Sequence, residues 1–413
     1  MNSKIFKGSN IFMHKSSFRF LWIGQSLANS GDVFYMVGLI AIIYGITGSV
    51  TYMAFVPFFI TTSRFLSGMI APLIIERVQL KSLLAYSQFG KTILVLILGC
   101  YTEFFPSSST IFLIFLLVIA ISFLDGWANP ARNTLVPIFI EQDFLVKANS
   151  FLAILDQTIR LGGWTVGGIL VSIIGGENVI WLTFFLFVAS TIMMFLIQNV
   201  DKHGFSQEKQ KKSTNWDILK EGWITIWHTP TLRTISIVEF FESIANVVWV
   251  AAIMYIYVEQ VLQTSEQWWG YINASFFAGL MIGGFCSLKW SHLVTQLPST
   301  VIVVGSFGAS LTTLMFGLVS TPWIALVISL IFGIVNQIKD VAQQTAVQKS
   351  VVHRLLPKIY SAKDALVTAT FGVSSLVLGN LTDMFGVRFT FLLAATLLFI
   401  SSIFLMTNHK KIS

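Results

Sequence analysis

Apolar runs of about twenty residues recur along the whole chain, and each is long enough to cross a bilayer as a helix. Twelve runs are present, at residues 18–45, 52–75, 82–102, 110–133, 148–174, 178–199, 233–260, 268–289, 299–319, 323–346, 360–383 and 387–407. Backbone polar groups find no water inside lipid, so each span must satisfy them internally as a helix. The pattern predicts an all-α polytopic membrane protein with twelve transmembrane helices.

Composition excludes the soluble classes of protein. Only 11% of the 413 residues are charged and 55% are hydrophobic, with a mean hydropathy of +0.77. A soluble domain carries about 25% charged residues, so this chain lacks the polar groups to cover a globular surface. A soluble enzyme, a disordered protein and a nucleic-acid-binding domain are therefore excluded.

The placement of Lys and Arg predicts the orientation in the membrane. With both termini cytoplasmic, 20 of the 26 basic residues fall in cytoplasmic segments, and only Arg388 falls outside. The net charge of +7 is then a topology signal, and we expect no nucleic-acid partner. The predicted location is the cell membrane, specifically a bacterial cytoplasmic membrane.

The longest polar stretch, Asp201 to Thr231, divides the spans into two sets of six. We therefore expect an N-terminal six-helix bundle at residues 1–200, a cytoplasmic linker at 201–232 and a C-terminal six-helix bundle at 233–413. Inside the linker, the spacing predicts an amphipathic surface helix over 216–227. Its apolar members are Trp216, Ile218, Leu219, Trp223 and Trp227.

The two halves are weakly repeated. A shift of 214 residues places Arg19 on Arg233 and Gln25 on Glu239, and a shift of 211 places Lys147 on Lys358. Duplicated halves joined by a long linker are typical of carriers that rock one half against the other around a midplane site.

Four motifs appear in order along the chain. They are Gly68 to Arg77 followed by Lys81, Pro130 to Pro137, Gly163 to Gly168, and Glu221 to Arg233. In these motifs the chain resembles the major facilitator superfamily, and more narrowly its drug:proton antiporter-3 branch of macrolide and siderophore exporters. Glu76 stands where the branch has Asp, and Trp164 stands where its antiporter signature has Pro.

The resemblance implies two pseudo-symmetric six-helix halves, a small organic substrate and protons as coupling ions. We expect a monomer in the lipid bilayer, with no cofactor and no enzymatic activity. The histidines lie outside the spans, so no intramembrane metal site is expected. Gly90-Lys91-Thr92 lacks the first glycine of a phosphate-binding loop, because position 85 is Ala, so an ion gradient is the expected energy source.

The motifs also contain candidate gate and packing residues. Glu76 and Arg77 are placed to hold a cytoplasmic gate through charge pairs and helix-end dipoles, although structural turn charges are the alternative. The full predicted gate set is Gly68, Glu76, Arg77, Asp125 and Arg132. Gly163, Gly167 and Gly168 predict a close helix crossing, because small residues let backbones approach in lipid.

Twelve charged residues lie inside the predicted spans, at least three residues from either end. The acids are Asp32, Asp125, Asp156, Glu239, Glu242, Asp340 and Asp364, and the bases are Arg64, Lys91, Arg160, Lys339 and Lys363. A charge at the bilayer centre costs roughly 2.5–3.5 kcal/mol on insertion scales. We therefore expect these side chains to face the protein interior and to pair.

Three acids are candidates for proton coupling. Asp32 lies in the middle of the first span, where burial and a neighbouring cation would move its pKa in opposite directions; a structural salt bridge to Arg64 or Lys91 is the alternative. Glu239 and Glu242 are three residues apart and share one helix face, where two acids do not both ionise easily. Their alternative role is ion pairing with Lys339 or Lys363.

The remaining candidates are predicted substrate contacts. They are Phe34, Tyr35, Arg64, Lys91, Asp156, Arg160, Asn336, Lys339 and Asp340. Asn336 belongs to an unusually polar tenth span that favours a cavity wall. Asp156 and Arg160 can instead form an intrahelical pair, and Phe34 and Tyr35 can simply pack.

The sequence therefore predicts a proton-coupled exporter of a small organic molecule that works by alternating access. Five basic residues within the spans favour a charged metabolite, such as a siderophore or an opine-type metallophore. A multidrug or macrolide efflux antiporter is the first alternative, and a lysophospholipid flippase the second. A sensor without transport and an intramembrane enzyme are the alternatives from other classes.

Overall fold

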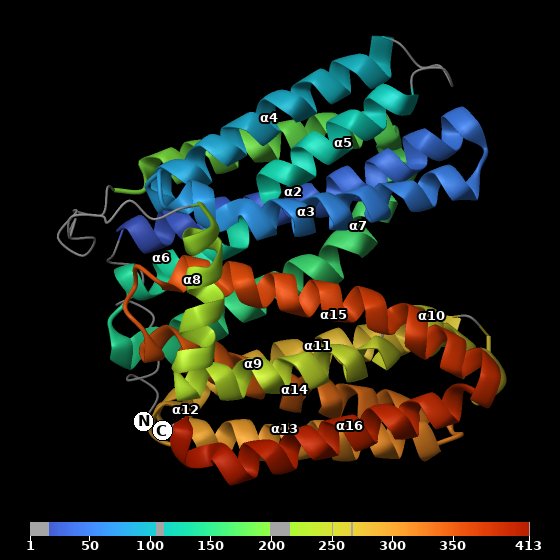
Figure 1. Ribbon diagram of the computed structural model, residues 1–413. Helices are drawn as coiled ribbons and strands as arrows, with labels where there is room; N and C mark the ends of the chain where they lie inside the picture. Colours follow the sequence, from blue (N-terminus) through green and yellow to red (C-terminus); the bar gives the residue numbers. More distant parts are fainter. Residues whose placement is uncertain (1–15, 105–110, 199–214, 250, 266, 413) are drawn as a thin grey trace. The chain divides into compact units, whose positions relative to one another are not determined.

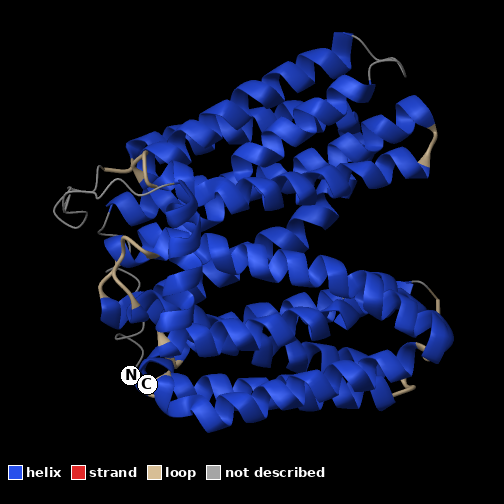
Figure 2. Cartoon of the chain, viewed as in Figure 1, coloured by secondary structure: helices blue, strands red, loops and turns tan. Residues whose placement is uncertain are grey.

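The computed structural model describes residues 16–104, 111–198, 215–249, 251–265 and 267–412. These residues form helices joined by short turns, and no strand occurs among them (Figures 1 and 2). The basic residues of segment 1–15 and of the linker before residue 215, which we expect to be cytoplasmic, lie outside the described residues. The predicted all-α class is confirmed.

The helix bounds follow the apolar runs. The earlier helices are α2 (Ser16–Thr47), α3 (Val50–Ile75), α4 (Leu80–Phe104), α5 (Ile111–Asp125), α6 (Ala128–Phe139), the 3₁₀ turn η2 (Gln142–Phe144) and α7 (Leu145–Leu196). The later ones are α8 (Asn215–His228), α9 (Pro230–Ala245), η4 (Asn246–Trp249), α10 (Ala251–Gln260), α11 (Gln267–Lys289), α12 (Ser291–Gln296), α13 (Pro298–Leu318), α14 (Pro322–Ser350), α15 (Leu356–Phe385), α16 (Val387–Asn408) and η5 (His409–Lys411).

The described helices account for the twelve predicted spans. Ten are long and apolar enough to cross a membrane. The pair Pro230–Trp249 and Ile253–Gln260, bent by 43°, passes the same test when the two helices are taken together and then counts as an eleventh. The stretch Gln142–Leu196 covers two predicted spans, because α7 is interrupted at Gly175. The split between the ninth and tenth spans is present, with Pro322 at the first turn of α14, where its fixed φ suits a helix start.

Gly175 and Gly386 give a structural sign of the internal repeat. Both have φ of 83° and ψ of 159°, a left-handed conformation that favours glycine. They are 211 residues apart in the sequence, the same spacing that relates Lys147 to Lys358. The turn between the fifth and sixth spans is therefore built like the turn between the eleventh and twelfth.

Contacts divide the chain into two compact units. Unit 1 contains Met1–Glu141, Thr158–Gly222 and Val352–Ala362, and unit 2 contains Gln142–Gln157, Trp223–Val351 and Lys363–Ser413. Two long helices are therefore divided between the units. The first turns of α15 belong to unit 1 and its remainder to unit 2, whereas the first turns of α7 belong to unit 2 and its remainder to unit 1. The domain boundaries inferred from the sequence stay a prediction.

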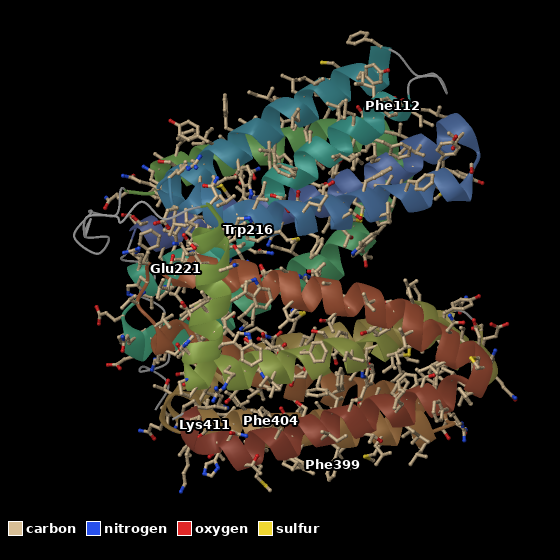
Figure 3. The ribbon with its side chains drawn as sticks, in the orientation of Figure 1. Phe112, Trp216, Glu221, Phe399, Phe404 and Lys411 are labelled. Carbon is tan, nitrogen blue, oxygen red and sulfur yellow. The ribbon has the colours of Figure 1, made fainter. Side chains whose placement is uncertain are left out.

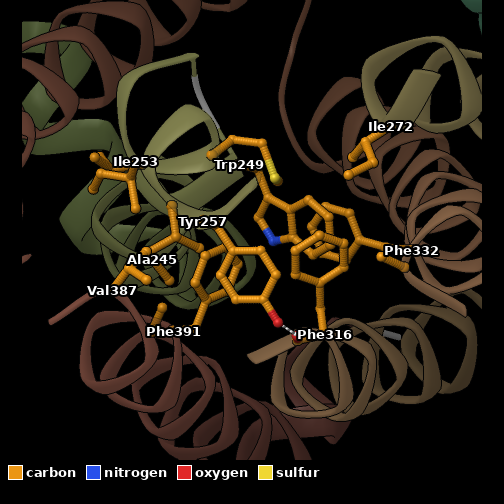
Figure 4. Packing of buried hydrophobic residues seen from close by; sticks show 14 of the residues in the cluster. Ala245, Trp249, Ile253, Tyr257, Ile272, Phe316, Phe332, Val387 and Phe391 are labelled. Carbon is orange, nitrogen blue, oxygen red and sulfur yellow. Dashed lines mark hydrogen bonds between the residues drawn. The ribbon is translucent and has the colours of Figure 1, made fainter. Parts of the chain in front are cut away.

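The core of unit 2 is aromatic and surrounds Trp249 at the break between α9 and α10 (Figure 4). The Trp249 ring stacks on Phe332 with centroids 4.0 Å apart, and its Nε1 donates to Thr313 Oγ1 at 3.3 Å. The Tyr257 hydroxyl donates to the carbonyl of Phe316. The same carbonyl, in the last turn of α13, also accepts from the backbone N–H of Val319 at 3.3 Å.

The predicted glycine motif of α7 packs on α2 inside unit 1. A Cβ atom at Gly163 would lie 3.0 Å from Val33 Cγ1, and one at Gly167 would lie 3.4 Å from Phe34 and Val37. Gly168 differs, because a Cβ there would meet no atom within 4 Å. Two of the three predicted packing glycines therefore lie at the helix crossing.

This difference gives a stability test with a control five residues away in the same helix. We expect Gly163→Leu to destabilise the protein by about 1–3 kcal/mol, because overpacking must push Val33 and α2 aside. Gly168→Leu serves as the matched control and should leave the thermal unfolding midpoint in detergent unchanged. Equal midpoints for the two variants would contradict the crossing.

Candidate functional site

Four charged side chains from four helices meet in unit 1. Asp32 comes from α2, Arg64 from α3, Lys91 from α4 and Asp125 from the last residue of α5. Lys91 Nζ lies 2.9 Å from Asp32 Oδ1 and 2.5 Å from Asp125 Oδ1. Arg64 Nη2 lies 2.6 Å from Asp125 Oδ2 and 3.5 Å from Asp32 Oδ2. Two cations and two carboxylates thus form a cluster of zero net charge, which we call the unit 1 cluster.

The two cations of this cluster have different surroundings. The Lys91 side chain is 1% exposed and its Nζ lies 4.8 Å from the centre of the Phe187 ring, whereas the Arg64 side chain is 40% exposed. Lys91 is therefore the enclosed cation of the cluster, and Arg64 is the more exposed one.

The two carboxylates are held with unequal strength. Asp125 accepts both cations at 2.6 Å or less, whereas the shortest contact of Asp32 is 2.9 Å. Charge-assisted bonds weaken as they lengthen, so protonation of Asp32 breaks the weaker contacts. The sequence placed Asp125 in the gate set, but the structure places its side chain against Lys91 and Arg64.

The predicted aromatic contacts Phe34 and Tyr35 follow Asp32 in α2 by two and three residues. The Tyr35 ring is 2% exposed and belongs to the apolar core of unit 1, and its hydroxyl has no hydrogen-bond partner among the described residues. Phe34 is half-buried beside Gly167. Packing accounts for the Tyr35 ring, but it leaves the hydroxyl unexplained.

A second group of charges surrounds α9 in unit 2. Glu242 Oε1 lies 2.8 Å from Lys339 Nζ, and Glu239 Oε1 lies 2.8 Å from Lys363 Nζ. The structure thus contains the ion pairs with Lys339 and Lys363 that were the alternative role for these two acids. Each acid of the predicted pair therefore has its own cation.

Acids outnumber bases in this second group. Asp340 Oδ1 lies 3.8 Å from the already paired Lys339, and Asp340 accepts a bond from Asn336 Nδ2 at 3.1 Å. The Asp340 side chain is 46% exposed, and Asp364 on α15 is also exposed. The polar face of α14 thus carries a partly open carboxylate beside a buried ion pair.

Other polar residues of α14 are engaged by the start of α7, within unit 2. Asn149 Nδ2 donates to Thr345 Oγ1 at 2.9 Å and to Gln348 Oε1 at 2.7 Å, and Gln157 Nε2 donates to Gln337 at 3.3 Å. The polarity of the tenth span therefore serves helix packing over part of its length. Asn336 and Asp340 remain the members available to form a cavity wall.

The predicted gate residues Glu76 and Arg77 have partners from distant segments of unit 1. Lys358 Nζ is 1% exposed, forms an ion pair with Glu76 and lies 2.5 Å from Glu221 Oε2 on α8. Arg77 Nη2 donates to Asn215 Oδ1 at 3.2 Å. The sequence related Lys358 to Lys147 through the repeat, but it did not predict that Lys358 pairs with Glu76.

The remaining predicted site residues take varied positions. Arg132 is 7% exposed and buried at α6, and a Cβ at Gly68 would meet no atom within 4 Å. Asp156 is half-buried in unit 2, and Arg160 is exposed in unit 1. Their intrahelical pairing stays a prediction.

A cavity of about 440 Å³ lies apart from both charge groups. Thr231, Val294, Leu297, Lys349 and Ile412 are among its lining residues. In the part of the chain that the structure describes, its lining includes none of the predicted site residues, and Lys349 is its one charged side chain. The candidate site is therefore defined by the intramembrane charges and not by this cavity. Among the described residues, no group of three or more metal-ligating side chains is present.

Comparison with known proteins agrees with this architecture. The family model MFS_3, described as transmembrane secretion effector, matches residues 10–411. The uncharacterized MFS-type transporter YfmI of Bacillus subtilis (strain 168) is 30% identical over 381 residues, covering 92% of this chain and 93% of that protein. The multidrug efflux pump Tap of Mycolicibacterium fortuitum is 22% identical over 283 residues, covering 66% of each chain.

Solved structures share the fold at low identity. A bacterial homologue of the iron transporter ferroportin, in an outward-facing state, has a TM-score of 0.76 at 13% identity, covering 95% of this chain and 99% of that one. The E. coli fucose:proton symporter FucP has a TM-score of 0.68 at 13% identity, covering 96% and 98%.

The apolar helices and paired intramembrane charges define a multi-pass transporter of the cytoplasmic membrane. The chain belongs to the major facilitator superfamily, in the family of transmembrane secretion effectors. Its members carry small molecules across the membrane by secondary transport and are not enzymes.

The buried pair in unit 2 gives a test of the charge arrangement. We expect Lys339→Met to destabilise the protein by about 3–5 kcal/mol, because it leaves Glu242 buried without its cation. Adding Glu242→Gln should restore most of the loss. Lys349→Met, at an exposed position of the same helix, is the control. A double variant as unstable as the single one in detergent unfolding would contradict the pairing.

Proposed function

We propose that this protein is a proton-coupled exporter that works by alternating access, with Asp32 as the coupling carboxylate. The observation that carries the proposal is the unit 1 cluster. In it Asp32 is the more loosely held of two acids that share Lys91 and the partly exposed Arg64. Protonation of Asp32 removes one of the two negative charges that face Lys91 and Arg64. The cluster then carries a net positive charge, and a ligand near Arg64 would interact with that charge.

Glu239 and Glu242 take a secondary role in this proposal. Each lies 2.8 Å from its own lysine. Protonating Glu239 therefore leaves the buried Lys363 without its carboxylate, and protonating Glu242 leaves Lys339 with the longer 3.8 Å contact to Asp340. Weakening a buried pair in this way costs several kcal/mol. We propose that these two acids hold α9 against α14 and α15, and that Asp32 moves the proton.

The engaged cations favour a multidrug-type substrate over a polyanionic metabolite. The preference for a siderophore or metallophore rested on five bases within the spans. Four of them, Arg64, Lys91, Lys339 and Lys363, lie in ion pairs with carboxylates. Tap, a relative of this chain, is named a multidrug efflux pump. We therefore propose an organic drug-like substrate with few negative charges, and keep the metallophore as the second candidate.

We further propose that Glu76 and Lys358 form part of a cytoplasmic gate. Glu76 closes α3 at the predicted cytoplasmic end, and Lys358 lies in the first turn of α15. The lysine is buried and pairs with two carboxylates. Removing one partner of a buried ion pair costs several kcal/mol, so the contact is suited to a gate that is either fully closed or fully open.

The coupling proposal is tested by comparing two modes of transport. In energised inverted vesicles we expect protonophore-sensitive uptake of a macrolide or other drug, and no uptake of metal-free metallophores. Asp32→Asn should reduce this gradient-driven uptake to background. It should leave substrate exchange without a gradient near the parent rate, because exchange requires no proton movement.

Asp143→Asn, at an exposed position of η2, is the matched control and should behave like the parent. Loss of exchange together with uptake would assign Asp32 to substrate binding or folding. Metallophore uptake without drug uptake would favour the second candidate. Uptake insensitive to a protonophore would contradict proton coupling.

The gate proposal predicts a turnover defect. Glu76→Gln should slow export while substrate affinity stays near the parent value, because the residue does not contact substrate. Lys358→Met should slow it further, since Glu76 and Glu221 then face each other without a cation. Lys410→Met, an exposed lysine, is the control. Weaker substrate affinity at unchanged turnover would contradict a gate.

A further inference from the structure

The helix α8 has two opposite faces with different surroundings. It is continuous from Asn215 to His228, so helix geometry at 3.6 residues per turn relates its positions. Ile218, Gly222 and Ile226 follow at four-residue intervals, and all three are buried. The opposite face carries large exposed side chains, which we call the tryptophan face: Trp216, Lys220, Trp223, Ile224 and Trp227.

The tryptophan face is strongly apolar and open. Trp216 is 67% exposed, Trp223 is 37% exposed and Trp227 is 56% exposed. Its one charged side chain is Lys220, whose Nζ lies 5.6 Å from the centre of the Trp216 ring. Three exposed tryptophans on about three turns of a helix form a patch that water solvates poorly.

The buried face fixes the direction in which the tryptophans point. A Cβ at Gly222 would lie 2.5 Å from the Lys358 carbonyl oxygen, so α8 contacts the start of α15 backbone to backbone. Glu221 anchors the same contact through Lys358 Nζ, at 2.5 Å. Figure 3 labels Glu221 and Trp216 on this helix. Rotation of α8 to bury the tryptophans would break both contacts.

The position of α8 along the chain places it at the membrane surface. It ends at His228, and α9, the first part of a broken span, begins at Pro230 with a single residue between them. Figure 1 shows α8 running across the direction of α9. A helix that turns sharply into a span at the predicted cytoplasmic side lies at the level of the lipid headgroups.

We propose that α8 lies in the headgroup region of the cytoplasmic leaflet, with its tryptophan face against phospholipid. Tryptophan is enriched at membrane interfaces because its ring is apolar and its N–H remains hydrated. Lys220 is placed to meet lipid phosphate. The helix thereby connects the membrane surface to Lys358, through Glu221 and Gly222 on its other face. This interaction requires neither a substrate nor proton coupling.

Spin-label accessibility tests the proposal on the full chain in phospholipid nanodiscs. Nitroxides are attached at W223C and W227C in a background where Cys100 and Cys286 are replaced by Ala. Collisions with oxygen, which partitions into lipid, are compared with collisions with a water-soluble nickel chelate. V304C, on α13 at a 64% exposed position, is the hydrocarbon reference, and Q142C, at an exposed position in η2, is the aqueous reference.

We expect an oxygen-to-nickel ratio between the two references at both sites, as for a label at headgroup depth. A ratio equal to that of Q142C would place the face in water and overturn the proposal. Low accessibility to both reagents would indicate a protein partner and would also overturn it.

A label-free measurement guards against an effect of the cysteine substitutions. Lipids brominated near the headgroup should quench tryptophan fluorescence less in the W216F/W223F/W227F variant than in the parent protein. W268F/W290F, outside α8, is the comparison variant for the loss of emitting rings. Unchanged quenching in the α8 variant would contradict contact with lipid.

Discussion

The pairing of buried charges is the constraint on which the rest of this structure depends. Lys91 and Lys339 are each 1% exposed, and each has a carboxylate within 2.9 Å. An unpaired ammonium at such a site costs several kcal/mol. Because each partner lies on another helix, the ion pairs also decide which helices meet: α4 with α2 and α5, and α14 with α9. Charge pairing thus supplies a specificity that apolar contacts alone do not supply in lipid.

The two halves solve this problem with lysines on different helices. A shift of 214 residues relates Lys91 to Gly305 and Asp125 to Lys339. In the first half the lysine lies on α4 and an acid on α5. In the second, the lysine lies on α14, and a Cβ at Gly305 would lie 2.8 Å from its Cβ. The buried lysine of each half therefore occupies a different position of the repeat.

Part of the candidate site was predictable from the residues. The insertion cost of charges predicts that Asp32, Glu239 and Glu242 form ion pairs. The structural alternatives considered for these acids were ion pairs with nearby bases. Three of those bases are their partners in the structure: Lys91, Lys339 and Lys363. The partners of Asp125 were not predictable, because which cations reach the end of α5 depends on how α3 and α4 approach it. Lys358 and Glu221 are 137 residues apart, and no local pattern joins them.

The sequence by itself determined the number and length of the spans, since lipid requires about twenty apolar residues for each crossing. The turns at Gly175 and Gly386 are also local in origin, because few other residues adopt their positive φ. Only the tertiary structure decided which cation meets which acid, that Gly163 packs while Gly168 does not, and that α8 buries Ile218 and exposes its tryptophans. These outcomes depend on how helices rotate and cross. Many side chains set that geometry together, and no single segment encodes it.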